Sequence, residues 1–212
     1  MKDPLFDTSA EDYDNWYESH PEVFASEVKA VKALGLEGLG LDVGAGTGII
    51  SSEIGAQVAL DPSLAMLRLS KQRKLDAVRG VAENLPFADG AFDFVLMATT
   101  ICFLENSVES LLETRRVLKN YGSMAICIIP KNSSWGRFYS AKGKKGHKIY
   151  GNARFYSVNE VKALLRECGF RPDMVSSVLR FGPRSAPRKE EPRIGEEKGG
   201  FVCIRAKKSR TS

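Results

Sequence analysis

The run of residues 39–50 constrains the fold of this chain more than any other stretch. Its apolar first part ends in three alternating glycines, Gly44, Gly46 and Gly48. A short apolar run that meets glycines is typical of a buried strand entering a tight turn, where the backbone can take positive φ and a ligand can approach closely. A helix beginning directly after such a turn offers unpaired N–H groups to an anionic group. The run therefore predicts a strand, a ligand-binding turn and a helix in an α/β fold.

The spacing of the glycines distinguishes two kinds of ligand-binding turn. A dinucleotide fingerprint, G-x-G-x-x-G, would require its third glycine at Ile49. The pattern here is G-x-G-x-G, with Asp42 two residues before the first glycine. It resembles motif I of the class I S-adenosylmethionine-dependent methyltransferases. The resemblance implies S-adenosyl-L-methionine as the cofactor, with Asp42 and the glycine turn at its methionyl end.

A second acid, Asp61, closes the next expected strand, residues 57–61. Asp61 comes 19 residues after Asp42, where doubly wound folds place a carboxylate that accepts hydrogen bonds from the ribose hydroxyls. Asp61 also precedes Pro62 and Ser63 at the expected start of a helix, residues 64–70, so a capping role is open as well. Both interpretations place Asp61 at the carboxyl edge of the sheet.

Residues 81–87 follow a short third strand and resemble the G-x-A-E-x-L-P-F loop of the same family. The resemblance implies that Ala82 and Glu83 lie near the adenine ring, where an acceptor can bind its exocyclic amine. The full set of predicted cofactor-binding residues is Asp42, Gly44, Ala45, Gly46, Gly48, Asp61, Pro62, Ala82, Glu83, Met97 and Tyr13.

The rest of the pattern predicts a Rossmann-like, seven-stranded and mostly parallel sheet with helices on both faces and an antiparallel seventh strand. Further strands are expected at 92–97, 123–129, 175–179 and 201–204, and helices at 108–118 and 155–169. Ser157 and Glu160 have the spacing of a capping box. We expect one methyltransferase domain, residues 1–212, with the following parts: an N-terminal helical cap (1–36), a cofactor-binding half (37–130), an insertion (131–154) and a C-terminal helix with an antiparallel strand pair (155–212).

Two aromatic segments are candidates for the acceptor site. Residues 13–17 resemble the Y-D-x-W segment that begins many small-molecule methyltransferases, and residues 131–154 form a glycine-punctuated loop that mixes aromatic residues with lysines. Such a loop suits a mobile cover over an anionic or aromatic substrate. Helix packing for the first segment and a solvated excursion for the second are the alternatives. The predicted acceptor-binding residues are Trp16, Thr99, Trp135, Tyr139, His147 and Tyr150.

Composition limits the class of protein. The 212 residues are 43% hydrophobic with a net charge of +5, which is ordinary for one folded domain and only weak evidence for nucleic acid. Cys102, Cys127, Cys168 and Cys203 are widely spaced and mostly in apolar runs, which favours reduced thiols in a cytoplasmic protein over disulfides or a metal site. The longest nearly apolar run, residues 92–104, contains an acid and is too short to span a bilayer, so no membrane insertion is expected.

The sequence therefore predicts an S-adenosylmethionine-dependent methyltransferase that acts on a small molecule, with no metal. RNA or protein methylation is the alternative, because residues 131–154 and the tail ending in Arg205, Lys207, Lys208 and Arg210 are basic; a module that binds the cofactor without turnover is a second. We assign no catalytic residue and no oligomeric state. The groups considered as a general base are His20, His147, Tyr139, Tyr150 and Glu105.

Overall fold

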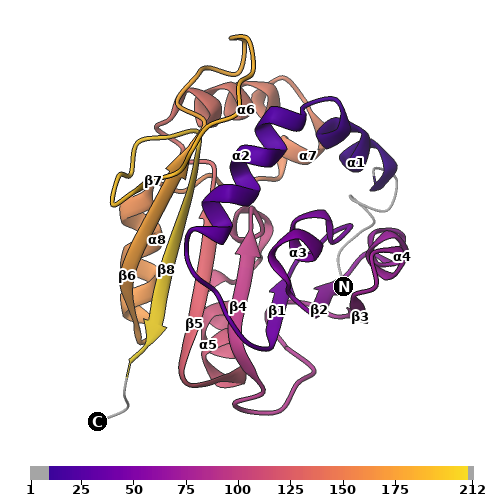
Figure 1. Ribbon diagram of the computed structural model, residues 1–212, viewed down its shortest axis with the longest axis vertical. Coiled ribbons are helices and arrows are strands. Elements are labelled where there is room, and N and C mark those ends of the chain that lie inside the picture. The colour runs from indigo at the N-terminus through magenta and orange to yellow at the C-terminus, as the bar shows by residue number, and fades with distance from the viewer. Residues whose placement is uncertain (1–9, 210–212) are drawn as a thin grey trace.

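The computed structural model describes residues 10–209, so the outer ends of the predicted domain, and Arg210 of the basic tail, lie outside the described residues. Helices and strands alternate along most of the chain (Figure 1). The strands are β1 (Gly40–Val43), β2 (Val58–Asp61), β3 (Asp76–Arg79), β4 (Phe92–Ala98), β5 (Leu118–Ile128), β6 (Phe170–Val178), β7 (Arg193–Ile194) and β8 (Phe201–Lys208). The helices are α1 (Ala10–Glu18), α2 (Pro21–Lys32), α3 (Ile49–Ile54), α4 (Leu64–Gln72), the 3-10 helix η1 (Ile101–Phe103), α5 (Ser107–Val117), α6 (Ser134–Lys144), α7 (Lys148–Gly151) and α8 (Val158–Glu167).

The strands form one sheet in the order β3-β2-β1-β4-β5-β8-β6-β7. Strands β1 to β5 pair in parallel, whereas β8 runs antiparallel to both β5 and β6. Because β1 lies between β2 and β4, the strand order reverses there, and open α/β sheets bind ligands outside the carboxyl ends of strands at such a switch point. The predicted Rossmann-like class, with its antiparallel final strand, is confirmed.

Alternating side chains of the central strands pack into two hydrophobic cores, one on each face of the sheet. On β5, Met124 and Ile126 pack with α5 and α8, while Ala125 and Cys127 between them pack with α2 and α3. Successive side chains of a strand point to opposite faces, so a strand covered on both sides must be apolar throughout. The predicted cover of helices on both faces is confirmed. The capping box of Ser157 and Glu160 at the start of α8 is present as well.

The prediction of seven strands is wrong by one short strand. β7 pairs antiparallel with β6 at the edge of the sheet, inside the polar excursion 184–200 that connects β6 to β8, where no strand was expected. Glu190 fixes this excursion: its carboxylate pairs with Arg180 and Arg188, and its main-chain N–H donates to Ser26 Oγ at 2.9 Å. The main-chain bond to Ser26 ties the excursion to α2, and the carboxylate of Glu190 pairs with two arginines that precede it in the chain.

The prediction of a loop at residues 131–154 is also wrong. This segment forms α6 and α7, and the hydroxyl of Ser133 caps α6 by accepting from the N–H of Gly136 at 2.9 Å. Trp135 and Tyr139 are buried one turn apart on the inner face of α6. The spacing of these two aromatic residues is the helical signal that the glycines and lysines around them obscured.

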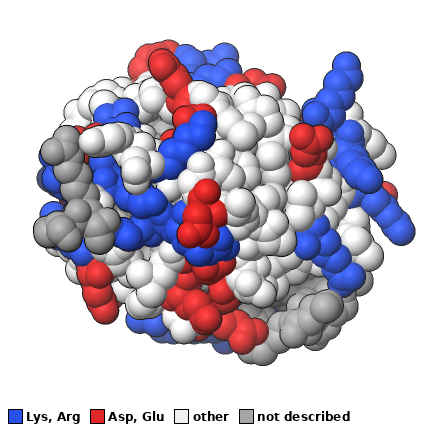
Figure 2. Space-filling model, turned by 90° about the horizontal axis from the view of Figure 1, so that it is seen from below, with Lys and Arg blue, Asp and Glu red and all other residues white. Residues whose placement is uncertain are grey.

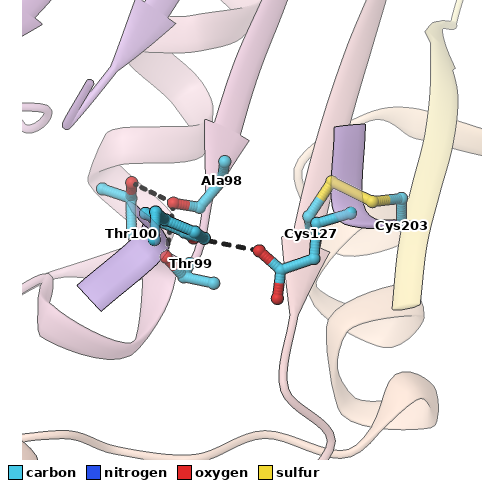
Figure 3. Close-up of a disulfide and its surroundings, with 7 residues drawn as sticks. Ala98, Thr99, Thr100, Cys127 and Cys203 are labelled. Atoms are coloured by element: carbon cyan, nitrogen blue, oxygen red, sulfur yellow. Dashed lines mark hydrogen bonds between the residues drawn. A yellow bond between two sulfur atoms is a disulfide. The ribbon is translucent and has the colours of Figure 1, made fainter. Parts of the chain in front are cut away.

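Cys127 of β5 and Cys203 of β8 form a disulfide, which corrects the expectation of reduced thiols for this pair (Figure 3). The two residues are direct partners in the antiparallel register and both are fully buried. They are 76 residues apart in the sequence, so only the strand pairing brings them together. Cys102 and Cys168 are free thiols, as predicted.

Helices α1, α6 and α7 gather beyond the ends of β1 and β4, at the top of the view in Figure 1. The opposite end of the molecule carries acidic and basic side chains close together (Figure 2). Where β4 and β5 begin, Lys119 pairs with Asp93, and Arg116 near the end of α5 pairs with Asp89. Within residues 10–209, no helix has both the length and the apolar character that crossing a membrane requires.

Candidate active site

The glycine turn after β1 has the backbone that its sequence predicts. Gly44, Gly46 and Gly48 all have positive φ, at 69°, 57° and 74°. A side chain at Gly44 would meet Thr100 Cγ2 at 2.2 Å, and one at Gly48 would meet Leu75 Cδ1 at 2.5 Å. At Gly46 the nearest atom is Met66 Sδ, at 3.8 Å. Gly44 and Gly48 are thus required by packing, whereas an added side chain at Gly46 would meet only this ordinary contact, which leaves room for a ligand.

Asp61 connects the end of β2 to this turn. Its carboxylate accepts the main-chain N–H of Gly46 and that of Ser63, each at 2.9 Å. Ser63 in turn caps α4 through its own hydroxyl. The structure therefore places Asp61 beside the glycine turn and gives it a role in shaping that turn, and ribose binding stays a prediction.

Asp42 is the buried acid at the end of β1. Its Oδ2 accepts the hydroxyl of Ser51 at 2.6 Å, while Oδ1 is buried without a partner among the described residues. Burial raises the pKa of Asp42 to about 7, against the hydrogen bond from Ser51 and with a further contribution from the charge of Asp61. An orphaned carboxylate oxygen next to a glycine turn suits a cationic donor, so the site fits a cofactor that carries an ammonium group and a sulfonium.

Helix α1 is fastened to the glycine turn by a side chain that the sequence reasoning missed. Asp14 accepts the hydroxyl of Thr47 at 2.6 Å and pairs with Arg73 at 2.7 Å, and Arg73 also donates to the carbonyl of Thr47 at 3.0 Å. Thr47 lies between Gly46 and Gly48, and Arg73 follows α4. This triad, Asp14, Thr47 and Arg73, holds α1 over the carboxyl edge of the sheet.

We expect Asp14→Ala to loosen α1, because it leaves the buried hydroxyl of Thr47 and the guanidinium of Arg73 without their acceptor. The free energy that holds α1 in place should fall by about 1–3 kcal/mol. Amide hydrogen exchange should become faster across α1 than in the control Glu11→Ala, which removes an exposed acid from the same helix. Equal exchange rates in the two variants would contradict a fastening role for the triad.

A cavity of about 260 Å³ lies beside the turn and is lined by α1, α2, the end of β4, η1, the end of β5, α6 and α7. All six predicted acceptor-binding residues line it: Trp16, Thr99, Trp135, Tyr139, His147 and Tyr150. Tyr13, predicted at the cofactor, lines it too. Tyr139 stacks obliquely on Tyr150, with ring centroids 4.4 Å apart. The structure thus brings together aromatic residues from two distant segments of the chain.

The cavity and the glycine turn meet where β4 ends. Thr99 has a φ of 57°, which is rare for a β-branched residue, and its main-chain N–H donates to the carbonyl of Cys127 at 2.9 Å (Figure 3). This sharp change of direction lets Thr99 line the cavity while Thr100 packs on Gly44 and donates to its carbonyl at 3.2 Å. Strained backbone of this kind is concentrated at functional sites.

Glu27 is a second residue that the sequence reasoning missed. It lines the cavity from α2, is only 4% exposed, and accepts the hydroxyl of Tyr17 at 2.9 Å. The signal was present, since Glu27 is an acid on the buried face of the helix, between Val23 and Val31. Apolar periodicity alone marks that face as core, and it does not reveal that a cavity adjoins it.

The remaining predicted residues lie outside this cavity. Met97 is fully buried in the core, and Pro62 is exposed beside Asp61. Ala82 is buried, and Glu83 accepts the main-chain N–H groups of residues 105 and 106. Of the base candidates, His20 and Glu105 do not line the cavity, and His20 stacks on Trp16 instead. No cluster of potential metal ligands exists among residues 10–209.

Asp61→Ala is expected to weaken binding of S-adenosylhomocysteine by about 1–3 kcal/mol, because charge-assisted hydrogen bonds are lost and the turn at Gly46 loses its acceptor. Asp61→Asn keeps one acceptor oxygen and should fall between wild type and alanine. Calorimetric titration measures the affinity, and thermal unfolding separates loss of the turn from loss of the ligand contact. An unchanged affinity in Asp61→Ala would remove Asp61 from the cofactor site.

Comparison with known proteins agrees with this geometry. Residues 41–126 match the Methyltransf_11 family, described as a methyltransferase domain. A Thermotoga maritima structure, described as a SAM-dependent methyltransferase, possible histamine N-methyltransferase, superposes with a TM-score of 0.92 at 35% identity, covering 97% of this chain and 99% of that one.

Two relatives found by sequence extend the comparison. The uncharacterized protein MJ1123 of Methanocaldococcus jannaschii is 35% identical over 96% of this chain and 98% of its own length. A demethylmenaquinone methyltransferase of Mycobacterium sp. (strain KMS) is 34% identical over 47% of this chain and 46% of its own. The chain therefore belongs to the S-adenosylmethionine-dependent methyltransferases, in the type 11 branch, and S-adenosyl-L-methionine is its cofactor.

Proposed function

We propose that this enzyme transfers the methyl group of S-adenosylmethionine to a small organic acceptor held in the aromatic cavity. The observation that carries the proposal is the junction at Thr99 and Thr100, where one side chain lines the cavity and the next packs on the glycine turn. A cavity of about 260 Å³ suits a small molecule. The description of the Thermotoga maritima relative, which names a small acceptor, agrees with this class.

The bound cofactor supplies a methyl group on a positively charged sulfur, which is a good leaving group. Asp42, Gly46 and Asp61 are proposed to hold it, with Ala45 and Gly48 shaping the turn and Ala82 and Glu83 near the base. The chain's own contribution is to orient the acceptor and to exclude water, which converts a bimolecular step into an oriented one. The triad at α1 and the aromatic residues of α6 serve this exclusion.

Label from radioactive S-adenosylmethionine tests the proposal. The enzyme is incubated with fractionated small metabolites, with RNA and with protein, and label is expected in one metabolite fraction. Gly46→Ala, which is proposed to block the cofactor turn, serves as the negative control. Label in RNA or protein would replace the small-molecule acceptor by the corresponding macromolecule, and cofactor binding without label in any fraction would indicate a module without turnover.

We also propose that the whole chain acts as one domain, with α1 and α2 as its cap and α6 and α7 as the cover of the acceptor. A cytoplasmic location is part of the same proposal, supported by the free thiols of Cys102 and Cys168, although the disulfide of Cys127 does not support it. Fractionation of the source cells with detection of the native protein tests the location.

A further inference from the structure

We infer that the methyl acceptor is a small amine, bound in the cavity as its ammonium ion by the carboxylate of Glu27 and the surrounding aromatic faces. The inference rests on the proposed function and gives the acceptor its chemical class. It departs from the anionic option in the sequence-based expectation of an anionic or aromatic substrate, and it is compatible with the aromatic option.

The charges that line the cavity are acidic. Asp12 and Glu27 both line it, and among the described lining residues there is no Lys or Arg; His147 is the single basic side chain there. The lysines of α6 lie outside and are exposed, and the ammonium of Lys142 sits 4.9 Å from the ring centre of Phe138. The helix that was expected to bring cations to the substrate thus brings aromatic rings, and an anionic acceptor would find no lysine or arginine to pair with in the cavity lining.

Glu27 has less compensation than a buried carboxylate normally requires. The carboxylate of Glu27 accepts a hydrogen bond from the neutral hydroxyl of Tyr17, and within residues 10–209 it forms no ion pair. Removing a carboxylate from water is costly unless a cation or several hydrogen bonds replace the lost hydration. Because Glu27 adjoins the cavity, a cation that enters it supplies the missing partner.

The aromatic lining suits the same ligand. Tyr17 packs edge-on against Trp16, with centroids 5.1 Å apart, and Tyr139, Tyr150 and Trp135 close the cavity from α6 and α7. The face of an aromatic ring attracts an organic cation, and the attraction grows when water is excluded. A carboxylate inside an aromatic cavity therefore favours an ammonium ion over a neutral molecule of equal size.

The raised pKa of Glu27 is consistent with an ammonium ion that replaces the proton of Glu27 when it binds. Burial raises the pKa of Glu27 to about 8, partly opposed by the hydrogen bond from Tyr17. The phenols near it are those of Tyr13, Tyr17, Tyr139 and Tyr150, whose pKa values burial also raises, and none of them is a cation near neutral pH. The other titratable groups that line the cavity are Asp12, Cys102 and His147. In the free cavity Glu27 holds a proton at pH 7, and an ammonium ion that binds there releases it to solvent.

Methyl transfer from this complex requires the ammonium nitrogen to lose a proton first. The ammonium ion gives one N–H proton to the Glu27 carboxylate, and the freed nitrogen lone pair forms the new N–C bond to the methyl carbon. The C–S bond breaks, and its electron pair stays on sulfur, which leaves as a neutral thioether. The product is a methylated ammonium ion, and the proton on Glu27 returns to water.

Calorimetric titration without cofactor tests the inference with three probes of similar size: 2-phenylethylamine, 2-phenylethanol and phenylacetate. We expect the amine to bind at least about tenfold more tightly than the alcohol, and phenylacetate to be the weakest. Repeating the amine titration at pH 7 in buffers of different ionisation enthalpy should show release of nearly one proton per amine bound.

Glu27→Gln should lose about tenfold or more in affinity for the amine, together with the proton release, and keep its affinity for the alcohol. Glu22→Gln, on the same helix but outside the cavity lining, is the matched control and should behave as wild type. Equal binding of amine and alcohol by wild type would overturn the inference whether or not the variant folds. Label transfer to an acceptor without a basic nitrogen would also overturn it and leave the proposed function intact, whereas amine binding without transfer to any acceptor would overturn the proposed function alone.

Discussion

Alanine at Gly46 is expected to abolish cofactor binding while leaving the protein folded. The added methyl group meets only Met66 Sδ, at an ordinary contact distance of 3.8 Å. The loss of folding free energy therefore comes from the positive φ and should be about 1–2 kcal/mol. Binding of S-adenosylhomocysteine should fall by about 100-fold or more, because the methyl group occupies the space proposed for the cofactor. Urea unfolding and calorimetric titration measure the two effects separately.

Two other glycines act as controls for this experiment. Gly55 ends α3 with a φ of 75° and has no atom within 4 Å of an added side chain, so Gly55→Ala should show the backbone cost with normal cofactor affinity. Gly44→Ala adds a clash with Thr100 to the same backbone cost and should lose about 3 kcal/mol or more of folding free energy. If Gly46→Ala bound the cofactor as tightly as Gly55→Ala, the turn would not be the cofactor site.

The free energy of unfolding of the cofactor-free protein is expected to fall steeply as the pH rises from about 5 to about 8. Burial raises the pKa of Asp42 from 3.8 to about 7 and that of Glu27 from 4.5 to about 8. Between these values the folded protein holds protons that the unfolded chain releases, so the stabilisation is complete below the unfolded pKa and is lost as the pH passes the folded one. A difference of about three in pKa corresponds to roughly 4 kcal/mol for each acid.

Urea unfolding at pH 5.5 and pH 8.5 checks this expectation. Glu27→Gln should remove the larger part of the pH dependence between these two pH values and Asp42→Asn the smaller part, because the replacement cannot ionise and the pKa of Glu27 is the higher of the two. Acids with lowered pKa, such as Glu160, act in the opposite direction, but only below about pH 4.5, outside this window. A stability that is equal at both pH values would show that neither acid is buried in its neutral form.

The two predictions concern residues of two kinds, those that the sequence alone identified and those that it did not. Gly46 and Asp42 lie in one short run whose spacing carries the information, because a turn and the strand before it are local structures. Glu27 lies on the buried face of α2, which apolar periodicity marks only as core, and Asp14 lies within the aromatic segment 13–17. Their roles depend on partners such as Arg73 that lie far away in the chain.

The sequence by itself determined the α/β class, the glycine turn proposed to bind the cofactor, the acids at the ends of β1 and β2 and the aromatic residues proposed to bind the acceptor. These features follow from hydrophobic periodicity and from spacings within about 20 residues, which local backbone geometry translates directly. The tertiary structure alone decided the pairing of Cys127 with Cys203, the fastening of α1 and the acidic character of the cavity. The physical reason is that strand register and helix packing join residues from distant segments, and the burial that shifts the pKa of Glu27 exists only after they have met.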